Sequence, residues 1–311
     1  MRLGFIIPTY PNEKRVAILP KDLKKIKDEV VLEHGFGKNL DIEDSAYSGC
    51  EFLSREEIFK TCDSIFSLKL IQEEDYQYLR EGQMILGWIH PIGSGRNFLE
   101  SVGWEKKLKI VDLDNISPTC FYGKKTAPID FLRRDFFQKN SMNAGIASSI
   151  HALISMGFLP DSNTRVAILS SGNVAQGAFS FFAKFNSEIT MYYRKTMSEF
   201  KEKIGSFDII VNGIEIDKTA KAILTYDDLS KVKKGALIID SAADAGNAIE
   251  GTRFTSMDEP IYTKNDVYYY VINNAPSILY RKSSKDISEA LTASVLNRKI
   301  EDYAKIFEAL K

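Results

Sequence analysis

The chain has 311 residues, a formal net charge of −1 and 44% hydrophobic residues. Its length predicts about two domains, and its composition is that of a globular protein that can bury full cores. A charge near zero argues against a dedicated nucleic-acid-binding protein, which usually carries a basic surplus. The sequence holds no apolar run of about 18 residues, so we expect no transmembrane helix.

The beginning of the chain and its cysteines indicate a cytoplasmic protein. The opening MRLGFIIPTYPNEKR interrupts its apolar stretch at Pro8 and turns polar, which is not typical of a signal peptide. Cys50, Cys62 and Cys120 are widely spaced and form no C-x-x-C pair. This pattern favours reduced thiols over a disulfide framework or a zinc site, and we expect no metal.

Strand-like and helix-like segments alternate in the first part of the chain. Strands are expected at residues 3–7, 30–32, 64–69 and 84–90. One helix is expected to start in residues 20–27. A second helix should begin after Ser54, which forms a capping box with Glu57. The alternation predicts a parallel sheet covered by helices.

The same alternation starts again after a long helical stretch at residues 141–156. Further strands are expected at 165–169, 189–193, 208–212, 236–240 and 268–270, and helices at 173–185, 197–204 and 226–231. Residues 283–310 should form one or two helices. This succession of βα units is typical of a dinucleotide-binding domain.

The simplest architecture is an α/β protein with two Rossmann-like domains, each built on a parallel sheet. Residues 1–135 plus 275–311 would form a substrate domain. A dinucleotide-binding domain of residues 136–274 would be inserted into it.

The first βα turn of the second half carries a partial G-x-G-x-x-G fingerprint. Ser170 stands at the first glycine position, Gly172 keeps the second, and Ala175 takes the third. A plain strand–turn–helix would explain such a match on its own. The strand before it, the helix after it and a second strand ending about 20 residues later favour a nucleotide site. The predicted cofactor-binding residues of this turn are Ser170, Ser171, Gly172, Asn173, Val174 and Ala175.

The end of the second strand indicates which nicotinamide cofactor is used. An acidic residue there would bind the ribose 2′-hydroxyl of NAD, but this chain has Tyr193, Arg194, Lys195 and Thr196. Two cations and a hydroxyl suit a 2′-phosphate, because a guanidinium makes charge-assisted hydrogen bonds to phosphate. Ordinary surface charges are the alternative interpretation. We predict NADPH, bound through Arg194 and Lys195.

Short motifs follow one another in a fixed order along nearly the whole chain. They are NEKRVAI from residue 12, LK from 68, GQ from 82, WIH from 88, DSAAD from 240, EGTR from 250 and NAPS from 274. Together they resemble the alanine dehydrogenase and transhydrogenase-like family. The shorter chain, its opening residues, and the stretches REEIFKT, GNVAQGAFS and YYRKT are most similar to the N(5)-(carboxyethyl)ornithine synthase branch.

That resemblance implies an activity and a site. The branch condenses pyruvate reductively with the side-chain amine of ornithine or lysine, using NADPH. By position, Arg15 and Lys69 match the residues that hold the keto acid, and His90 matches the catalytic acid/base. Asp244 matches the carboxylate near the amine and nicotinamide, and Asn274 matches a cofactor contact. A homo-oligomer is also implied.

The chemistry is consistent with these residue types. A guanidinium grips a carboxylate through two parallel hydrogen bonds, and an ammonium adds charge near a carbonyl. Imine formation releases water and needs a proton donor, a role that suits histidine. Simpler interpretations exist: Lys69 as a surface lysine on an edge strand, and a packed or surface histidine. We prefer the simpler one for His34 and His151.

Two departures from the alanine dehydrogenase pattern bear on the substrate. Ser170 replaces the first fingerprint glycine, and the segment 140–145 lacks the glutamate that follows its serine in those enzymes. The second change is expected to help admit a longer amine. Arg253 and Arg281 are candidates to bind the carboxylate of that amine.

Three other functions remain open from the sequence. One is an alanine dehydrogenase that uses ammonia, and another is a saccharopine-dehydrogenase-like enzyme that uses 2-oxoglutarate. A third is a nucleotide sensor without catalysis.

Overall fold

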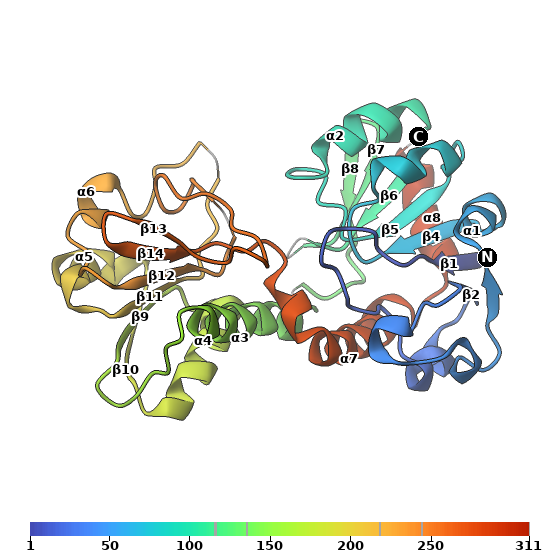
Figure 1. Cartoon of the computed structure of the whole chain (residues 1–311). Helices are drawn as coiled ribbons and strands as arrows, with labels where there is room; N and C mark the ends of the chain where they lie inside the picture. Colours follow the sequence, from blue (N-terminus) through green and yellow to red (C-terminus); the bar gives the residue numbers. More distant parts are fainter. Residues whose placement is uncertain (115–116, 135, 218, 244, 311) are drawn as a thin grey trace. The chain divides into compact units, whose positions relative to one another are not determined.

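The structure is a computed structural model that describes residues 1–114, 117–134, 136–217, 219–243 and 245–310. It divides into two compact units (Figure 1). The first comprises Met1–Phe137 and Tyr280–Lys311, and the second comprises Gln138–Leu279. Within the described ranges, the helices are too short or too polar to cross a membrane.

The first unit is built on an eight-stranded sheet with the order β3-β2-β1-β4-β5-β6-β7-β8. The strands are β1 (Arg2–Phe5), β2 (Glu29–Glu33), β3 (Glu51–Leu53), β4 (Ser64–Ser67), β5 (Met84–Gly87), β6 (Lys109–Asp112), β7 (Thr119–Tyr122) and β8 (Lys125–Pro128). The strands from β3 to β6 pair in parallel, while β7 and β8 are antiparallel. The direction in which successive strands are added to the sheet reverses between β1 and β4. Open α/β sheets bind ligands at such a position.

Helices from both ends of the chain cover this sheet. The short α1 (Arg55–Thr61) buries Ile58 and Phe59 against one face, and it begins with the expected capping box. The other face packs against α7 (Tyr280–Ala290) and α8 (Ile300–Leu310), whose Tyr303 and Phe307 are fully buried. In Figure 1 these red C-terminal helices lie beside the blue N-terminal strands. The short α2 (Arg96–Phe98) follows β5.

Serines of α7 fix the loop that follows β1. The Ser284 hydroxyl accepts the Val16 N–H at 2.8 Å, and the Ser288 hydroxyl accepts the Leu19 N–H at 2.9 Å. The Ser288 hydroxyl also donates to Asp22 at 2.7 Å. The loop therefore depends on residues from the far end of the sequence for its conformation.

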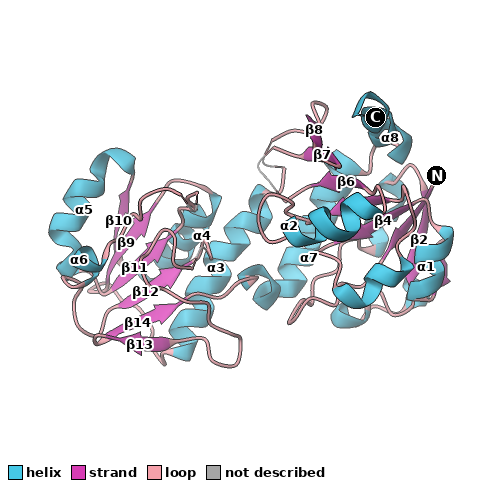
Figure 2. Ribbon diagram, turned by 90° about the horizontal axis from the view of Figure 1, so that it is seen from above, coloured by secondary structure: helices cyan, strands magenta, loops and turns pink. Residues whose placement is uncertain are grey.

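The second unit contains a six-stranded sheet with the order β10-β9-β11-β12-β14-β13, which can be followed in Figure 2. Its strands are β9 (Arg165–Leu169), β10 (Glu188–Tyr192), β11 (Ile209–Asn212), β12 (Leu237–Asp240), β13 (Tyr262–Lys264) and β14 (Val267–Tyr270). Only β13 is antiparallel among these strands. The chain order reverses at β9 and β11, so the first βα turn lies at the switch point.

Two helices that pack closely cover one face of the second sheet. They are α3 (Gln138–Ser155) and α4 (Asn173–Phe182); α5 (Met197–Lys203) packs on the other face, and α6 (Tyr226–Leu229) precedes β12. A Cβ atom at Gly145 would lie 1.9 Å from the Val174 carbonyl oxygen, and one at Gly177 would lie 2.0 Å from the Met142 oxygen. The crossing of α3 and α4 therefore requires both glycines.

The expected α/β class with two mostly parallel sheets is confirmed, and strand 165–169 has the expected bounds. The segment at Pro20 differs, because it forms a 3-10 helix, Pro20–Lys25. Strands 64–69 and 84–90 end earlier than expected. Their pairing stops at Ser67 and Gly87, after which the chain leaves the sheet.

The α3–α4 crossing generates a stability prediction. Gly145→Ala should lower the free energy of unfolding by about 1–3 kcal/mol, because the new methyl overlaps a backbone carbonyl that cannot move away. This loss should occur although alanine favours a helix by about 1 kcal/mol over glycine. Denaturant unfolding measures it. The control is Ile154→Ala on the same helix, where the side chain is 71% exposed and the change should be within about 0.5 kcal/mol. A Gly145→Ala protein as stable as the parent would contradict this account of the crossing.

Candidate active site

Polar residues gather where four adjacent strands of the first unit end. Arg15 follows β1, Lys69 follows β4, His90 follows β5, and Asp112 is the last residue of β6. Since β1, β4, β5 and β6 are neighbours in one parallel sheet, their carboxyl ends share one edge. Lys69 and His90, two of the residues expected at the site, thus follow one strand edge. The charges of Arg15 and Glu13 act on the Lys69 ammonium, which places Arg15 near it.

Arg15 is held by Glu13 in a buried, bidentate ion pair. The Arg15 Nε donates to one Glu13 oxygen at 2.8 Å and Nη2 donates to the other at 2.6 Å. The Arg15 backbone N–H also donates to Glu13, at 2.8 Å. Burial disfavours the Glu13 carboxylate, but the Arg15 charge and hydrogen bonds, with the Lys69 charge, outweigh this and lower its pKa to about 2. Glu13 therefore stays ionised and fixes the guanidinium plane.

Sequence reasoning did not assign Glu13 a place in the site. Its only signal was its position two residues before Arg15 in the NEKR motif. The pair has a consequence for binding: a substrate carboxylate cannot use the Nε–Nη2 edge of Arg15 without displacing Glu13.

Lys69 lies beside this pair and is half-buried. Its Nζ is 5.0 Å from the centre of the Tyr10 ring, a cation–π contact. Burial and the Arg15 charge lower the pKa of Lys69, while the Asp114 and Glu13 charges oppose that shift. Because β4 lies in the interior of the sheet, the interpretation of Lys69 as a surface residue on an edge strand is wrong.

His90 has a strained backbone and a closely packed ring. Its φ of 51° is left-handed, which costs a non-glycine residue about 1 kcal/mol or more. A Cβ at Gly93 would lie only 2.4 Å from His90 Cε1, so the imidazole packs against the bare backbone there. The Ser94 hydroxyl is 3.3 Å from His90 Nδ1. These contacts orient the ring and engage one of its two nitrogens.

Asp112 is a fully buried carboxylate that sequence reasoning missed. Its Oδ1 accepts the backbone N–H groups of Ile89 at 3.2 Å, His90 at 3.0 Å and Asp114 at 3.3 Å. Burial is the main cause that raises the pKa of Asp112 to about 6; the backbone N–H groups oppose it and the Asp114 charge adds to it. A single acid at the end of a four-residue strand carries no distinctive sequence signal.

The first βα turn of the second unit has the features of a phosphate-binding loop. Ser170 has a φ of 113°, a conformation that favours glycine, and its hydroxyl accepts the Gly172 N–H at 3.0 Å. Gly172 precedes α4, and a Cβ there would contact Ser170 Oγ at 3.4 Å. Ala175 is buried and lies close to Gly213, where an added Cβ atom would be 3.2 Å from the Ala175 nitrogen. This close helix–strand approach and the exposed helix N-terminus fit a dinucleotide pyrophosphate.

Arg194 and Lys195 are exposed and follow the end of β10, with Tyr193 between. The Ser170 N–H donates to the Tyr192 carbonyl at 2.9 Å, so the ends of β9 and β10 are adjacent. The Thr196 hydroxyl caps this turn by accepting the Tyr193 N–H at 2.9 Å. The two cations therefore follow a strand end that is adjacent to the turn at Ser170.

Other strand ends of the second unit carry buried polar residues. The Asn212 amide donates to the Asp240 carboxylate at 3.0 Å, which joins the ends of β11 and β12. Asn274 is buried with a φ of 72°, and its carbonyl accepts the Ser277 N–H at 3.0 Å. Asp244, predicted as catalytic, lies outside the described residues.

The structure gives other roles to the two arginines considered for the amine's carboxylate. Arg281 bonds to the Asp41 carboxylate and to the Leu40 carbonyl at 3.2 Å. The Arg253 guanidinium stacks over Tyr262, 4.6 Å from its ring centre. Neither contact argues for a substrate role.

The remaining histidines match the simpler interpretation. His151 Nδ1 is 3.1 Å from the Tyr270 hydroxyl, and burial lowers the pKa of this histidine. His34 is exposed, 3.4 Å from an Asp44 carboxylate oxygen. The segment 140–145 also has a packing role, since Met142 and Gly145 form part of the α3–α4 crossing. Its effect on amine size stays a prediction.

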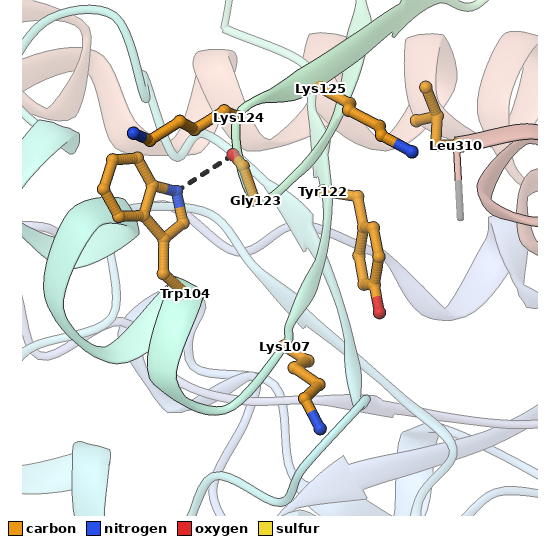
Figure 3. A pocket seen from close by; sticks show the side chains of 7 residues that line it. All are labelled: Trp104, Lys107, Tyr122, Gly123, Lys124, Lys125 and Leu310. Atoms are coloured by element: carbon orange, nitrogen blue, oxygen red, sulfur yellow. Dashed lines mark hydrogen bonds between the residues drawn. The ribbon is translucent and has the colours of Figure 1, made fainter.

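Figure 3 shows a surface hollow of the first unit. The turn that joins β7 to β8 contributes to it, and the Trp104 indole donates to the Gly123 carbonyl at 2.9 Å. Because β7 runs antiparallel to β6, this turn lies near the start of β6. The hollow is lined by Trp104, Lys107, Tyr122, Gly123, Lys124, Lys125 and Leu310.

Known proteins resemble this chain in sequence and in fold. The family models "Alanine dehydrogenase/PNT, N-terminal domain" and "Alanine dehydrogenase/PNT, C-terminal domain" match residues 9–119 and 161–309. An N(5)-(carboxyethyl)ornithine synthase of Clostridium botulinum is 53% identical over 98% of this chain and 97% of its own. Another, from Lactococcus lactis, is 51% identical over 98% of this chain and 99% of its own.

A solved L-alanine dehydrogenase superposes with a TM-score of 0.78 and 14% identity, and 100% of both chains is covered. This likeness shows the fold. With two relatives above 50% identity along almost their whole length, the chain belongs to the N(5)-(carboxyethyl)ornithine synthase family, within the alanine dehydrogenase/PNT group.

Proposed function

We propose that this chain catalyses the reductive condensation of pyruvate with the side-chain amine of ornithine or lysine, which gives N(5)-(1-carboxyethyl)ornithine in the first case. The observation that carries this proposal is the 53% identity to a carboxyethylornithine synthase across 98% of the chain. It favours this reaction over the use of ammonia, the use of 2-oxoglutarate, and a sensor without turnover.

Arg15 and Lys69 are proposed to hold the keto acid. Arg15 would bind the pyruvate carboxylate, and Lys69 would add positive charge beside the carbonyl. The Glu13 pair supports this role because it immobilises the guanidinium before substrate arrives. Orientation that exists before binding reduces the entropy lost on binding.

His90 is proposed to move the protons of the condensation. The amine nitrogen attacks the carbonyl carbon of pyruvate, and the resulting carbinolamine loses its hydroxyl as water when His90 donates a proton. Because Ser94 engages Nδ1, we assign this transfer to Nε2. The carboxylate of Asp244 is proposed to accept a proton from the amine, as the family resemblance implies.

The second unit is proposed to bind the nicotinamide cofactor, which supplies the hydride when bound. The binding residues are proposed to be Ser170, Ser171, Gly172, Asn173, Val174, Ala175, Arg194, Lys195 and Asn274. The finer proposal is NADPH, supported by the two exposed cations that follow β10. They are suited to a 2′-phosphate that NADH lacks.

Cofactor choice can be tested at Arg194. Arg194→Ala should weaken NADPH binding by about 10- to 100-fold, since one charged hydrogen-bond partner of a phosphate is worth about 1.5–3 kcal/mol. NADH binding should change little. Titration of both nucleotides measures this, with Lys234→Ala, which removes an exposed lysine paired to Asp266, as the control. Equal losses for both nucleotides, or a parent enzyme that prefers NADH, would refute the NADPH proposal.

The catalytic assignment can be tested at His90. His90→Gln should lower kcat by about two to four orders of magnitude, the range for losing a general acid–base. Binding of NADPH should persist because His90 lies in the other unit. Arg15→Lys provides the contrast: it should mainly raise the KM for pyruvate, because the fork geometry and the Glu13 pair are lost while the charge stays. Near-normal turnover of His90→Gln at saturating substrate would mean that another group donates the proton.

The substrate proposal can be tested by product analysis. The enzyme would receive either pyruvate or 2-oxoglutarate, in separate reactions, with NADPH and an equimolar mixture of ammonia, ornithine and lysine, and mass spectrometry would identify the products. We expect an N-(1-carboxyethyl) amino acid as the main product. Alanine as the main product would overturn the amine assignment, and a product formed only with 2-oxoglutarate would overturn the keto-acid assignment.

A further inference from the structure

We propose that Asp112 is a positioning residue for catalysis, which holds the backbone at His90 so that the imidazole faces the substrate. This inference rests on the proposed role of His90 and adds a residue that the sequence motifs do not include. Asp112 itself is fully buried, so it acts through His90 and does not touch the substrate.

The sheet alone does not hold the segment that carries His90. Pairing between β5 and β6 ends at Gly87 and Asp112, and the last backbone bond there runs from the Leu113 N–H to the Gly87 carbonyl at 2.9 Å. Beyond that point the N–H groups of Ile89 and His90 donate to the Asp112 side chain. A side-chain carboxylate thus continues the ladder for two residues after the strand has ended.

The same oxygen fixes both strand ends at once. Asp112 Oδ1 also accepts the Asp114 N–H at 3.3 Å, so one atom ties the chain after β5 to the chain after β6. A carboxylate suits this task because charge-assisted hydrogen bonds are stronger than neutral ones.

His90 needs such a restraint because its backbone is left-handed, with a φ of 51°. Most residues relax from this region to an extended or helical conformation when the surroundings allow it. A relaxed backbone would turn the imidazole away from Gly93 and from the Ser94 hydroxyl, which orient it. A displacement of about 1 Å in a catalytic group can reduce the rate by about 100-fold.

The test is a double-mutant cycle that combines Asp112→Asn with His90→Gln. The asparagine side chain would keep an acceptor oxygen without the charge, so kcat should fall by about tenfold, whereas Asp112→Ala should lose about 100-fold. The KM for pyruvate and the affinity for NADPH should stay within about twofold of the parent values, since neither depends on His90 orientation. In the His90→Gln background, Asp112→Asn should cause no further loss, because residues that act as one unit are not additive.

Asp63→Asn is the matched control. Asp63 accepts the Arg2 N–H at 2.7 Å at the amino end of the same sheet, and its replacement should leave kcat unchanged. Thermal unfolding of each variant shows whether it is folded. If Asp112→Ala does not fold, the kcat of Asp112→Asn in the parent and in the His90→Gln background still tests the proposal.

The proposal is overturned if Asp112→Asn keeps the parent kcat, or if it lowers the residual rate of His90→Gln by the same factor as in the parent. If His90→Gln itself keeps the parent kcat, the proposed role of His90 fails first, and that outcome is distinct from the other two.

Discussion

Parallel pairing of β1, β4, β5 and β6 is the constraint on which the rest of the first unit depends. It brings together the residues that follow four strands far apart in sequence, although no local motif links them. The loops at this edge cannot rely on the ladder, since pairing has ended where they begin. Backbone turns and side chains hold them: the Gly93 and Gly95 N–H groups donate to the His90 carbonyl. The side chains are Ser284 and Ser288 after β1, and Asp112 after β5.

These side chains are polar and buried, which is costly unless each is hydrogen-bonded. In the Glu13–Arg15 pair, two parallel hydrogen bonds between opposite charges offset the loss of hydration on burial. Replacing one partner of such a pair would leave a buried charge without compensation. The arrangement therefore serves the orientation of the Arg15 guanidinium more than stability.

In the second unit, small residues allow the helices and strands to pack closely. Gly145 and Gly177 allow α3 and α4 to touch backbone to backbone, and Ala175 and Gly213 bring α4 close to the end of β11. The turn at Ser170 keeps the left-handed backbone of a fingerprint glycine with a different residue. The hydroxyl of that serine compensates in part by accepting the Gly172 N–H. The turn thus keeps a positive φ at the first fingerprint position, although serine replaces glycine there.

The sequence predicted both sheets and several element boundaries, because these features depend on local patterns of apolar, capping and turn residues. Alternating apolar segments predicted both sheets, Ser54 with Glu57 predicted the start of α1, and the turn at residues 170–175 located the first βα unit. The strands β3, β6, β7, β8 and β13 were not predicted. Of these, β3, β8 and β13 contain no buried residue, so burial imposes no apolar pattern on their sequences.

Only the tertiary structure decided which residues support Arg15 and His90. Glu13 and Asp112 acquire their roles from contacts with particular partners, and a single carboxylate in a sequence does not reveal its partner. The pKa of Glu13 is lowered by an adjacent guanidinium, whereas burial raises that of Asp112. Chemically similar residues thus differ because burial and nearby charge are properties of the folded chain.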